Sequence, residues 1–411
     1  MSTPVVAYPH RSTSLPHRLL QSQFERVFLR RWRARGVRVR FWDGREVAAG
    51  EPPEVATVEI REPSVLWAML RSPSLGFGRA YADGRLEVLG DLEAFLEAAH
   101  VALGRSNGRP AGLGARLLRT LVAPRTSSAR AEANARFHYD TGNEFFRLWL
   151  DPSMSYSCAY FRSEDDDLAT AQTQKLDLIC RKLDLAPGQT LLDVGCGWGA
   201  LLFHAMERYG VRGVGVTPSR QQAEHVQSEA SRRGLVDRLA LEVCDWRRVR
   251  GRFDRVVSVG MYEHVGRRHG REFFRRWRDL LHPGGVSLLH TIGAMGPQAP
   301  DPWTVHYIFP GGYVPSLSDL AGHAASAGLV IADVENLWRH YALTLRAWAR
   351  NFAAARQTIL QRTDERFVRT WWLWLNGAEA GFRAGRLQLW QILLTPGKSP
   401  RQPLTRAAWV S

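Results

Sequence analysis

Apolar residues in the C-terminal two-thirds of the chain recur with two alternating periods. From about residue 131, segments with helical spacing are separated by short apolar runs of strand length. The segments are Ala169–Leu185, Thr190–Gly195, Ala200–Tyr209, Val214–Thr217, Arg220–Arg233, Leu239–Val243, Phe253–Gly260, Arg271–Leu281 and Gly285–Ile292. This alternation predicts an α/β domain with a parallel sheet, helices on both faces, and a ligand site at the carboxyl ends of the strands.

The first 125 residues have a different pattern, which predicts a smaller α+β domain. Short alternating runs at Val37–Phe41 and Val55–Ile60 indicate strands, and Asp91–Leu103 has helical spacing. Residues 104–130 are rich in Gly, Arg and Ser and are typical of a linker, with a short helix near Ala115–Val122. Apolar positions near the start form one face, at Leu19, Phe24, Val27, Phe28 and Leu29. We therefore divide the chain into residues 1–125 and 126–411.

The charge of the chain limits the classes of partner that it is expected to bind. With 55 Lys+Arg against 40 Asp+Glu, the formal net charge is +15. Residues 1–40 carry nine Arg against one acid, and residues 101–130 carry six Arg and no acid. Only three of the basic residues are Lys, and Arg pairs with phosphate in a bidentate manner, so the clusters favour an anionic partner over compositional bias alone.

Composition also argues against several classes of protein. At 45% hydrophobic residues the chain is globular, and no stretch of about 18 residues is apolar and uncharged enough to span a membrane. The N-terminus has no signal-peptide core. The four cysteines, Cys158, Cys180, Cys196 and Cys244, show no CxxC spacing. This disfavours disulfides and a zinc site, so we expect no metal and a cytoplasmic location.

A glycine-rich turn lies between the first strand and first helix of the α/β pattern. Leu191-Leu192-Asp193-Val194-Gly195-Cys196-Gly197-Trp198-Gly199 has the form GxGxG, not the dinucleotide fingerprint GxGxxG. In this strand–turn–helix context it resembles the class I S-adenosylmethionine methyltransferases, which have a Rossmann-like, mostly parallel seven-stranded sheet. The resemblance implies that Asp193, Gly195, Gly197 and Gly199 hold the amino-acid end of the cofactor.

The ends of the next two strands supply further candidates for cofactor binding. The second ends at Thr217 without the usual acid, so a hydroxyl or amide must hold the ribose, and Thr217 or Gln222 would suit. The third ends in Asp245-Trp246, where the acid can accept from the adenine amino group and the indole can stack. The alternative for Trp246 is ordinary core packing.

Motifs outside this generic fold carry a more specific resemblance. In order they are His138–Phe146, Leu150–Pro152, Tyr156–Phe161, Glu263–Gly266, Leu289–Ile292, Tyr307–Gly312, His340–Leu345 and Phe382–Gln391. Together they resemble the cyclopropane-fatty-acyl-phospholipid synthase family, including the mycolic acid cyclopropane synthases, over about residues 135–395. Residues 1–125 are similar, less clearly, to the lipid-associated domain of its phospholipid-acting members.

This resemblance implies two sites. Tyr156 and Ser157 join the S-adenosylmethionine site, and a bicarbonate ion is held by Cys158, Glu263, His290, Tyr341 and the backbone of Ile292. Of these, Cys158, Glu263, His290 and Tyr341 are the expected catalytic residues. The chain departs from the family at Arg247, where an acid is frequent, and at Ala378 beside Glu379, where many members have a cysteine.

The implied reaction explains why such residues are needed. An isolated cis alkene in an acyl chain attacks the sulfonium methyl group and leaves a carbocation, so the site must align the reactants, exclude water and remove a proton. Aromatic faces stabilise a cation without reacting with it. Glu263 either accepts the bicarbonate hydroxyl hydrogen or orients His290. Structural alternatives are that Glu263 caps a helix near Arg267 and that His290 is a satisfied core histidine.

Two further segments have candidate roles in lipid binding. Residues 293–315 indicate a lid or acyl-channel loop. The aromatic stretch Phe367–Trp374 is consistent with an acyl tunnel or a lipid interface, and also with plain core.

The leading hypothesis is thus cyclopropanation of a phospholipid acyl chain by an enzyme attached peripherally to the inner face of the anionic membrane. Methylation of the same alkene to a methylene or methyl branch is the alternative. A nucleic-acid binder or RNA methyltransferase would also explain the charge, but no RNA-binding motif is present, so we expect no nucleic-acid partner. A homodimer is left open.

Overall fold

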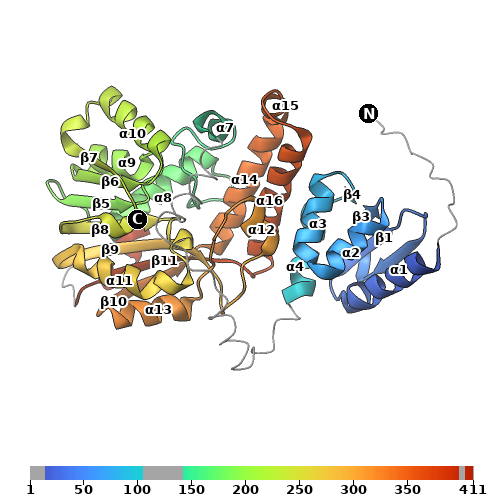
Figure 1. The fold of residues 1–411 in the computed structure, drawn as a ribbon. Helices are drawn as coiled ribbons and strands as arrows, with labels where there is room; N and C mark the ends of the chain where they lie inside the picture. The colour runs from blue at the N-terminus through green and yellow to red at the C-terminus, as the bar shows by residue number, and fades with distance from the viewer. Residues whose placement is uncertain (1–13, 105–141, 398–402, 411) are drawn as a thin grey trace. The chain divides into compact units, whose positions relative to one another are not determined.

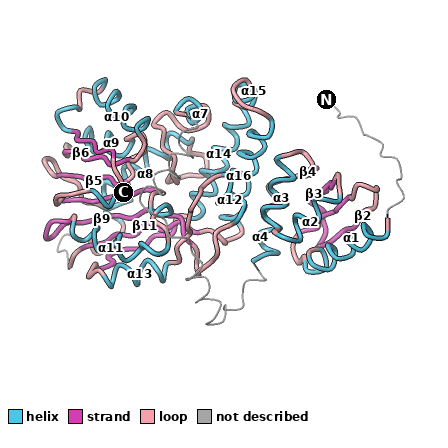
Figure 2. The backbone as a smooth tube through the Cα atoms, viewed as in Figure 1, coloured by secondary structure: helices cyan, strands magenta, loops and turns pink. Residues whose placement is uncertain are grey.

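The computed structural model describes residues 14–104, 142–397 and 403–410, which form two compact units (Figures 1 and 2). The first unit contains the N-terminal described segment together with Asp301–Tyr307 and Ala353–Arg386. The second contains the rest of the described chain. The expected domain boundary at residue 125 and the expected helix near Ala115–Val122 lie outside the described residues.

A seven-stranded sheet organises the second unit, in the order β10-β11-β9-β8-β5-β6-β7. Strands β5 to β9 are parallel to one another, whereas β11 is antiparallel to both β9 and β10. This is the mostly parallel sheet that the alternating pattern predicts. The strands are β5 (Thr190–Val194), β6 (Arg212–Thr217), β7 (Leu239–Val243), β8 (Phe253–Val259), β9 (Leu281–Gly293), β10 (Val330–Asn336) and β11 (Gln388–Thr395).

Consecutive apolar residues along the central strands point to opposite faces, and each face has its own core. Leu191 and Val257 pack on one side, and their neighbours Leu192 and Val256 on the other. The first core includes α8, α9 and α10, and the second includes α11 and α13. Helices of this unit are α7 (Asn143–Arg147), α8 (Leu168–Lys182), α9 (Ala200–Tyr209), α10 (Arg220–Arg232), α11 (Gly270–Asp279), α13 (Leu317–Ser326), α14 (Trp338–Ala354) and α17 (Ala407–Val410).

The first unit has a four-stranded sheet in the order β2-β1-β3-β4, in which only β1 and β3 are parallel. Its strands are β1 (Arg35–Arg40), β2 (Glu46–Ala49), β3 (Glu51–Ile60) and β4 (Leu86–Gly90). Its helices are α1 (Leu15–Val27), α2 (Pro63–Arg71), α3 (Pro73–Ala82), α4 (Leu92–Gly104), α12 (Pro302–Tyr307), α15 (Arg356–Leu360) and α16 (Glu365–Arg383).

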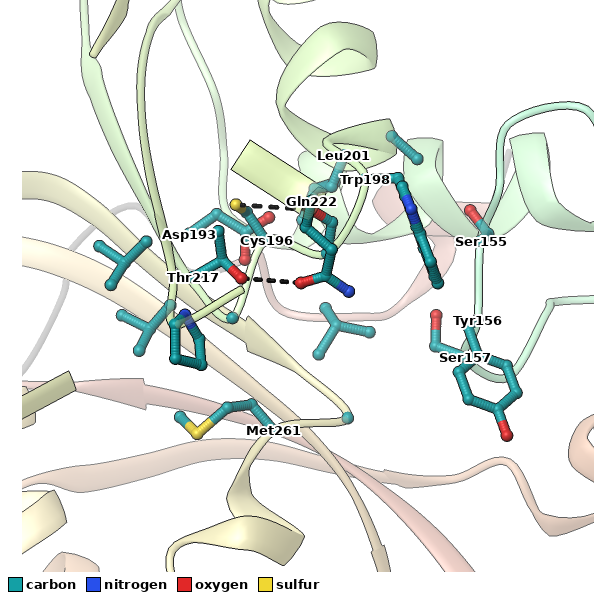
Figure 3. Close-up of a pocket in the computed structure, with 18 of the residues that line it drawn as sticks. Ser155, Tyr156, Ser157, Asp193, Cys196, Trp198, Leu201, Thr217, Gln222 and Met261 are labelled. Carbon is teal, nitrogen blue, oxygen red and sulfur yellow. Dashed lines mark hydrogen bonds between the residues drawn. The ribbon is translucent and has the colours of Figure 1, made fainter. Parts of the chain in front are cut away.

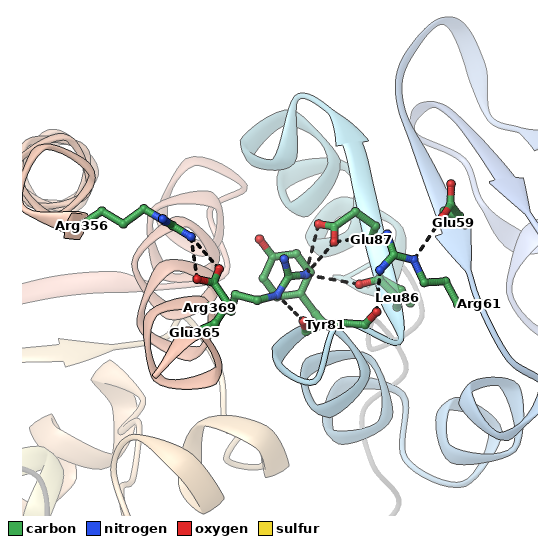
Figure 4. Close-up of polar contacts among 9 residues, drawn as sticks. Glu59, Arg61, Tyr81, Leu86, Glu87, Arg356, Glu365 and Arg369 are labelled. Atoms are coloured by element: carbon green, nitrogen blue, oxygen red, sulfur yellow. Dashed lines mark hydrogen bonds and ion pairs between the residues drawn. The ribbon is translucent and has the colours of Figure 1, made fainter. Parts of the chain in front are cut away.

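Helix α16 is joined to the N-terminal part of this unit by packing and by ion pairs. Arg369 donates to the carbonyl oxygen of Tyr81 (2.7 Å) and to Glu87 (3.0 Å), and its guanidinium lies 4.2 Å from the centre of the Tyr81 ring (Figure 4). His100 of α4 contacts the carbonyl oxygen of Gly377 at 3.0 Å. A segment from late in the sequence therefore completes a unit that starts near the N-terminus.

Three expectations from the sequence change in detail. Phe24 and Leu29 are buried as expected, but Leu19 is exposed, so the apolar positions of α1 do not all face the core. The expected loop at 293–315 contains helix α12. In the aromatic stretch of α16, Trp371 and Trp374 are buried, which favours core packing for these two side chains.

Candidate active site

A pocket lies at the carboxyl ends of the parallel strands of the second unit (Figure 3). Nine of the ten side chains or glycines expected to bind the cofactor line it, namely Tyr156, Ser157, Asp193, Gly195, Gly197, Thr217, Gln222, Asp245 and Trp246. The tenth, Gly199, is the N-cap of α9 and does not line the pocket. Nine residues expected from the glycine turn, the strand ends and the family resemblance therefore lie around one pocket.

The glycine turn has a backbone that other residues would strain. Gly195 has φ +86°, and a Cβ there would lie 2.7 Å from the Cβ of Met261. Gly197 has φ +56° with open space beside it. The turn thus leaves a cradle beside the backbone, which fits the close approach of a ligand.

The residues expected at the ribose and the adenine have partners within the protein. Thr217 Oγ1 lies 2.7 Å from Gln222 Oε1, so the hydroxyl donates to the amide oxygen (Figure 3). Asp245 accepts from the backbone and the guanidinium of Arg247, with the closest guanidinium contact at 2.9 Å. The same guanidinium lies 4.6 Å from the centre of the Trp246 ring. Arg247, which departs from the family pattern, therefore orients both Asp245 and Trp246.

Helix α8 holds the loop that carries Tyr156 and Ser157. Gln172 donates to the carbonyl oxygen of Ser157 (2.9 Å), and the Lys175 ammonium donates to the Ser157 hydroxyl (3.0 Å). Both α8 side chains are buried, and Lys175 also lines the pocket. The two side chains are three positions apart and lie on one face of α8, so together they hold the loop against this helix.

The pocket lining includes the buried acid Asp193 and the buried base Lys175, in addition to the buried Asp245. Burial raises the pKa of Asp193 to about 7, and the nearby positive charge of Lys175 opposes this rise. Burial lowers the pKa of Lys175 to about 8, opposed by the charges of Asp151 and Asp193. Asp193 Oδ1 is buried with no hydrogen-bond partner among the described residues. A ligand with an ammonium group would satisfy that oxygen, which fits the amino-acid end of S-adenosylmethionine.

A second polar cluster adjoins this pocket. Glu263 lies between Met261 and His264, which both line the pocket, and its Oε1 accepts from the backbone N–H of Ile292 (2.6 Å). Burial raises the pKa of Glu263 to about 7. Its Oε2 is buried with no partner in the described structure. Glu263 and Ile292, expected together in the anion site, are thus in contact.

His290 is oriented by Gln391 of the neighbouring strand. Its carbonyl oxygen accepts from the backbone N–H of Gly260, which lines the pocket (2.8 Å), and its Nδ1 lies 3.3 Å from Gln391 Nε2. Burial lowers the pKa of His290 well below its ordinary value. Its Nε2 is buried without a partner among the described residues. His290 is therefore a neutral ring whose Nδ1 faces Gln391 and whose Nε2 can contact a ligand.

Cys158 and Tyr341 meet at the carbonyl oxygen of Leu337. The Cys158 thiol lies 3.9 Å from the Leu337 oxygen and 3.1 Å from the carbonyl oxygen of Ala159. The backbone N–H of Tyr341 donates to the Leu337 oxygen (3.1 Å). The Leu337 N–H donates to Leu389, which pairs with Ile292 across β11 and β9. Hydrogen bonds and strand pairing therefore link the segments of Cys158, Tyr341 and Ile292, and Glu263 contacts Ile292 directly.

Sequence reasoning missed several residues of this region. Lys175 and Gln172 on α8, His264 in the pocket wall, and the pair Lys182 and Gln391 behind His290 were not among the candidates. One signal was available, because lysine is rare in a chain that otherwise uses arginine. Both described lysines are buried on α8.

The family models match two parts of the chain. Residues 126–392 match the model described as mycolic acid cyclopropane synthetase. Residues 24–103 match a model described as a domain of unknown function.

Characterised relatives cover most of the chain. A probable fatty acid methyltransferase of Pseudomonas putida is 34% identical over 87% of this chain and 91% of its own length. The cyclopropane-fatty-acyl-phospholipid synthase of Escherichia coli (strain K12) is 38% identical over 83% of this chain and 88% of its own.

Solved structures share the second unit's fold. The cyclopropane synthase MmaA2 from Mycobacterium tuberculosis has a TM-score of 0.62 and 34% identity, over 66% of this chain and 99% of that one. The mycolic acid cyclopropane synthase CmaA1, complexed with SAH and CTAB, has a TM-score of 0.61 and 37% identity, over 64% and 97%.

Proposed function

Because the chain belongs to the mycolic acid cyclopropane synthetase family, we propose that it transfers a methylene group from S-adenosylmethionine to the cis double bond of a phospholipid acyl chain. The chain is a methyltransferase of the class I fold. The observation that carries the proposal is the pair of unpartnered buried atoms, Glu263 Oε2 and His290 Nε2, beside the glycine-turn pocket. Buried polar atoms in folded proteins are as a rule hydrogen-bonded to protein, water or a ligand, so this pair leaves two contacts that a bound anion would satisfy.

The pocket residues serve to bind and orient the cofactor. Bound S-adenosylmethionine supplies an electrophilic methyl carbon, and bound bicarbonate supplies a base. Asp193 accepts from the ammonium group, Thr217 and Gln222 contact the ribose, and Trp246 stacks on the adenine. The loop of Tyr156 and Ser157 closes the amino-acid end. With both reactants held, the methyl transfer becomes effectively unimolecular.

Aromatic rings extend from the cofactor loop to the anion site. The ring centres of Tyr156 and Trp348 are 5.2 Å apart, and those of Trp348 and Tyr341 are 6.0 Å apart. Ring faces near the reacting alkene stabilise a developing carbocation by their quadrupoles and exclude water. Tyr156 and Tyr341 are therefore assigned to the two ends of one apolar, cation-tolerant wall.

A raised pKa explains how a carboxyl group can adjoin an anion. Since the pKa of Glu263 is about 7, a large fraction of the group is protonated near neutral pH. Oε1 already accepts from Ile292, so the proton lies on Oε2, which then donates to the bicarbonate. Burial also raises the pKa of the Cys158 thiol, which stays protonated and does not act as a nucleophile.

The decisive assay uses vesicles with cis-monounsaturated acyl chains, the purified enzyme and S-adenosylmethionine. We expect each product chain to gain one CH₂ and lose its double bond, with cyclopropane protons upfield in the NMR spectrum. Vesicles with saturated chains are the control. A methylene or methyl branch in the NMR spectrum would select the alternative product. No mass gain with cofactor binding intact would refute the proposal.

The first unit offers a surface for attachment to an anionic membrane. Leu15 and Leu19 on α1 and Trp67 on α2 are between 61% and 73% exposed, and the two helices pack against each other. Arg18 and Arg26 on α1 are also exposed. Apolar side chains flanked by arginines suit the headgroup region, where each basic residue contributes about 1 kcal/mol. No helix of the described residues is long and apolar enough to cross a membrane.

Sedimentation with anionic vesicles tests this attachment. The triple variant Arg18→Gln, Arg26→Gln and Trp67→Ser should bind such vesicles more weakly at low salt. Arg38→Gln is the matched control, because Arg38 is already paired with Glu46 and Glu54. Equal binding by the triple variant and the wild type would exclude this surface. Preferential cosedimentation with RNA would instead favour a nucleic-acid partner.

A further inference from the structure

A line of buried polar side chains connects an ion pair to the imidazole of His290. The Lys182 ammonium lies 2.5 Å from Glu335 Oε2 and 2.5 Å from Gln391 Oε1. Gln391 Nε2 lies 3.3 Å from His290 Nδ1. Lys182 is 2% exposed, and Gln391 and His290 are 1% exposed. Three elements, α8, β11 and β9, contribute one residue each to this line, and β10 supplies Glu335.

The direction of these hydrogen bonds follows from the ammonium group. A lysine ammonium can only donate, so the atom of Gln391 that faces it must be the carbonyl oxygen. The amide NH₂ of Gln391 therefore faces His290 and donates to Nδ1. An Nδ1 that accepts carries no proton, so the proton of the neutral ring lies on Nε2. This assignment does not depend on how the amide was oriented, because the reversed amide would place NH₂ against the ammonium.

A doubly protonated ring is excluded by the same geometry. It would set an Nδ1–H against the amide N–H of Gln391. Burial and the positive charges of Lys175 and Lys182 also lower the pKa of His290. The remaining nitrogen, Nε2, has no partner in the described part of the chain. It therefore offers a free N–H to the anion site.

We propose that Lys182 and Gln391 are positioning residues that fix His290 in the Nε2–H tautomer, so that His290 donates a hydrogen bond to the bound anion. This inference rests on the proposed function, since that function supplies the anion. It also assigns the proton transfer. Nδ1 is occupied by Gln391 and Nε2 is already protonated, so His290 cannot be the base. In the site proposed above, the base would then be the bound bicarbonate, which the Glu263 acid and the His290 N–H would hold by donating to it.

The tautomer is measured directly by NMR of protein labelled with ¹⁵N in the histidine rings. His290→Gln identifies the His290 signals by their loss. The wild type should show Nε2–H with an unprotonated Nδ1. Gln391→Glu places an acceptor opposite Nδ1, so a proton should appear on Nδ1 in this variant.

Gln388→Glu is the matched control. Gln388 is also a buried glutamine of β11, but its amide oxygen accepts from Asn336 (2.7 Å). We expect this control to keep the Nε2–H form. A wild-type ring with Nδ1–H, or an unchanged ring in Gln391→Glu, would overturn the inference. If Gln391→Glu fails to fold, Gln391→Leu should give a mixture of the two tautomers, and a single Nε2–H form there would equally overturn it.

Adding bicarbonate separates this inference from the proposed function. The Nε2–H signal should shift on titration with sodium bicarbonate and should not shift with sodium chloride. An intact Nε2–H tautomer that does not respond to bicarbonate would contradict the proposed anion site while supporting the role of Lys182 and Gln391. A response in the wild type that is lost in Gln391→Glu supports both.

Discussion

Replacing Glu263 by glutamine should make the protein more stable at neutral pH while removing its activity. Burial raises the pKa of Glu263 from its ordinary value of 4.5 to about 7. The folded state therefore keeps a proton between these two pH values that the unfolded chain releases. Because the unfolded chain binds fewer protons there, the free energy of unfolding falls as the pH rises through this window. Above about pH 7 the carboxyl group is ionised in both states, and the full destabilisation by its buried charge is present.

The size of the effect follows from the difference in pKa. A difference of about 2.5 corresponds to about 3 kcal/mol, at about 1.4 kcal/mol for each pKa unit. Glutamine removes the titration and keeps the shape, and its Oε1 can still accept from the Ile292 N–H, which now lies 2.6 Å from Glu263 Oε1. The variant should therefore gain about 3 kcal/mol relative to the wild type between pH 4.5 and pH 8. Its amide NH₂ still offers a donor at the position of Oε2, but it cannot exchange a proton there as the acid can.

Denaturant unfolding of both proteins at pH 5, 6, 7 and 8 measures this effect. The difference between their free energies of unfolding should be small at pH 5 and grow toward pH 8. Turnover on vesicles should fall sharply at every pH, while affinity for S-adenosylhomocysteine stays near that of the wild type. Stability curves that run parallel over the whole pH range would show that Glu263 has an ordinary pKa, and the reasoning about its proton would fail.

Three further changes test other parts of the molecule. Lys175→Met should raise the pKa of Asp193 above 7, because it removes the positive charge that lowers this pKa. The affinity for S-adenosylhomocysteine, measured by calorimetry, should therefore fall near pH 7 and recover as the pH rises, and a loss independent of pH would contradict this. Gly195→Ala places a Cβ 2.7 Å from that of Met261 at φ +86°, which costs at least about 1–2 kcal/mol and should weaken the same binding tenfold or more. Arg369→Gln should lower the thermal stability of the first unit by about 1–3 kcal/mol, and an unchanged melting temperature would show that its contacts contribute little.

Local patterns in the sequence were sufficient for most of the second unit. The expected segments Ala200–Tyr209 and Leu239–Val243 are α9 and β7 with the same bounds. Periodicity is reliable there because the central strands are buried on both faces and the helices that cover them on one, so these elements have a clear apolar signature. The glycine turn was found for a similar reason, since left-handed backbone requires glycine.

The first unit has features that local sequence patterns do not predict. Helices α15 and α16 and the short α12 belong to it, although all three start more than 200 residues after its last strand, which ends at Gly90. The contact between Arg369 and Tyr81 spans 288 positions, and no periodicity encodes such a pairing. The exposure of Leu19 has the same origin, because an amphipathic pattern does not state which side of a helix its neighbours cover.

The polar residues around the site were missed for a chemical reason. Gln391 lies in β11, where all eight residues are buried, and within a strand of that kind it looks like an isolated polar interruption. Its partners, Lys182 and His290, are 209 and 101 positions away. Only the three-dimensional arrangement shows that these groups satisfy one another.

Helix α8 connects the two halves of the site in a way that limits how the protein can change. Lys175 holds the cofactor loop and Lys182 holds the line of side chains behind His290. Seven residues separate them, which is about 10.5 Å along a helix and nearly two full turns. One rigid element therefore sets the spacing between the loop of Tyr156 and Ser157 and the side chains behind His290. Inserting or deleting a single residue between the two lysines would turn one ammonium by about 100° and break its contacts, so the length of this helical interval is fixed by both ends at once.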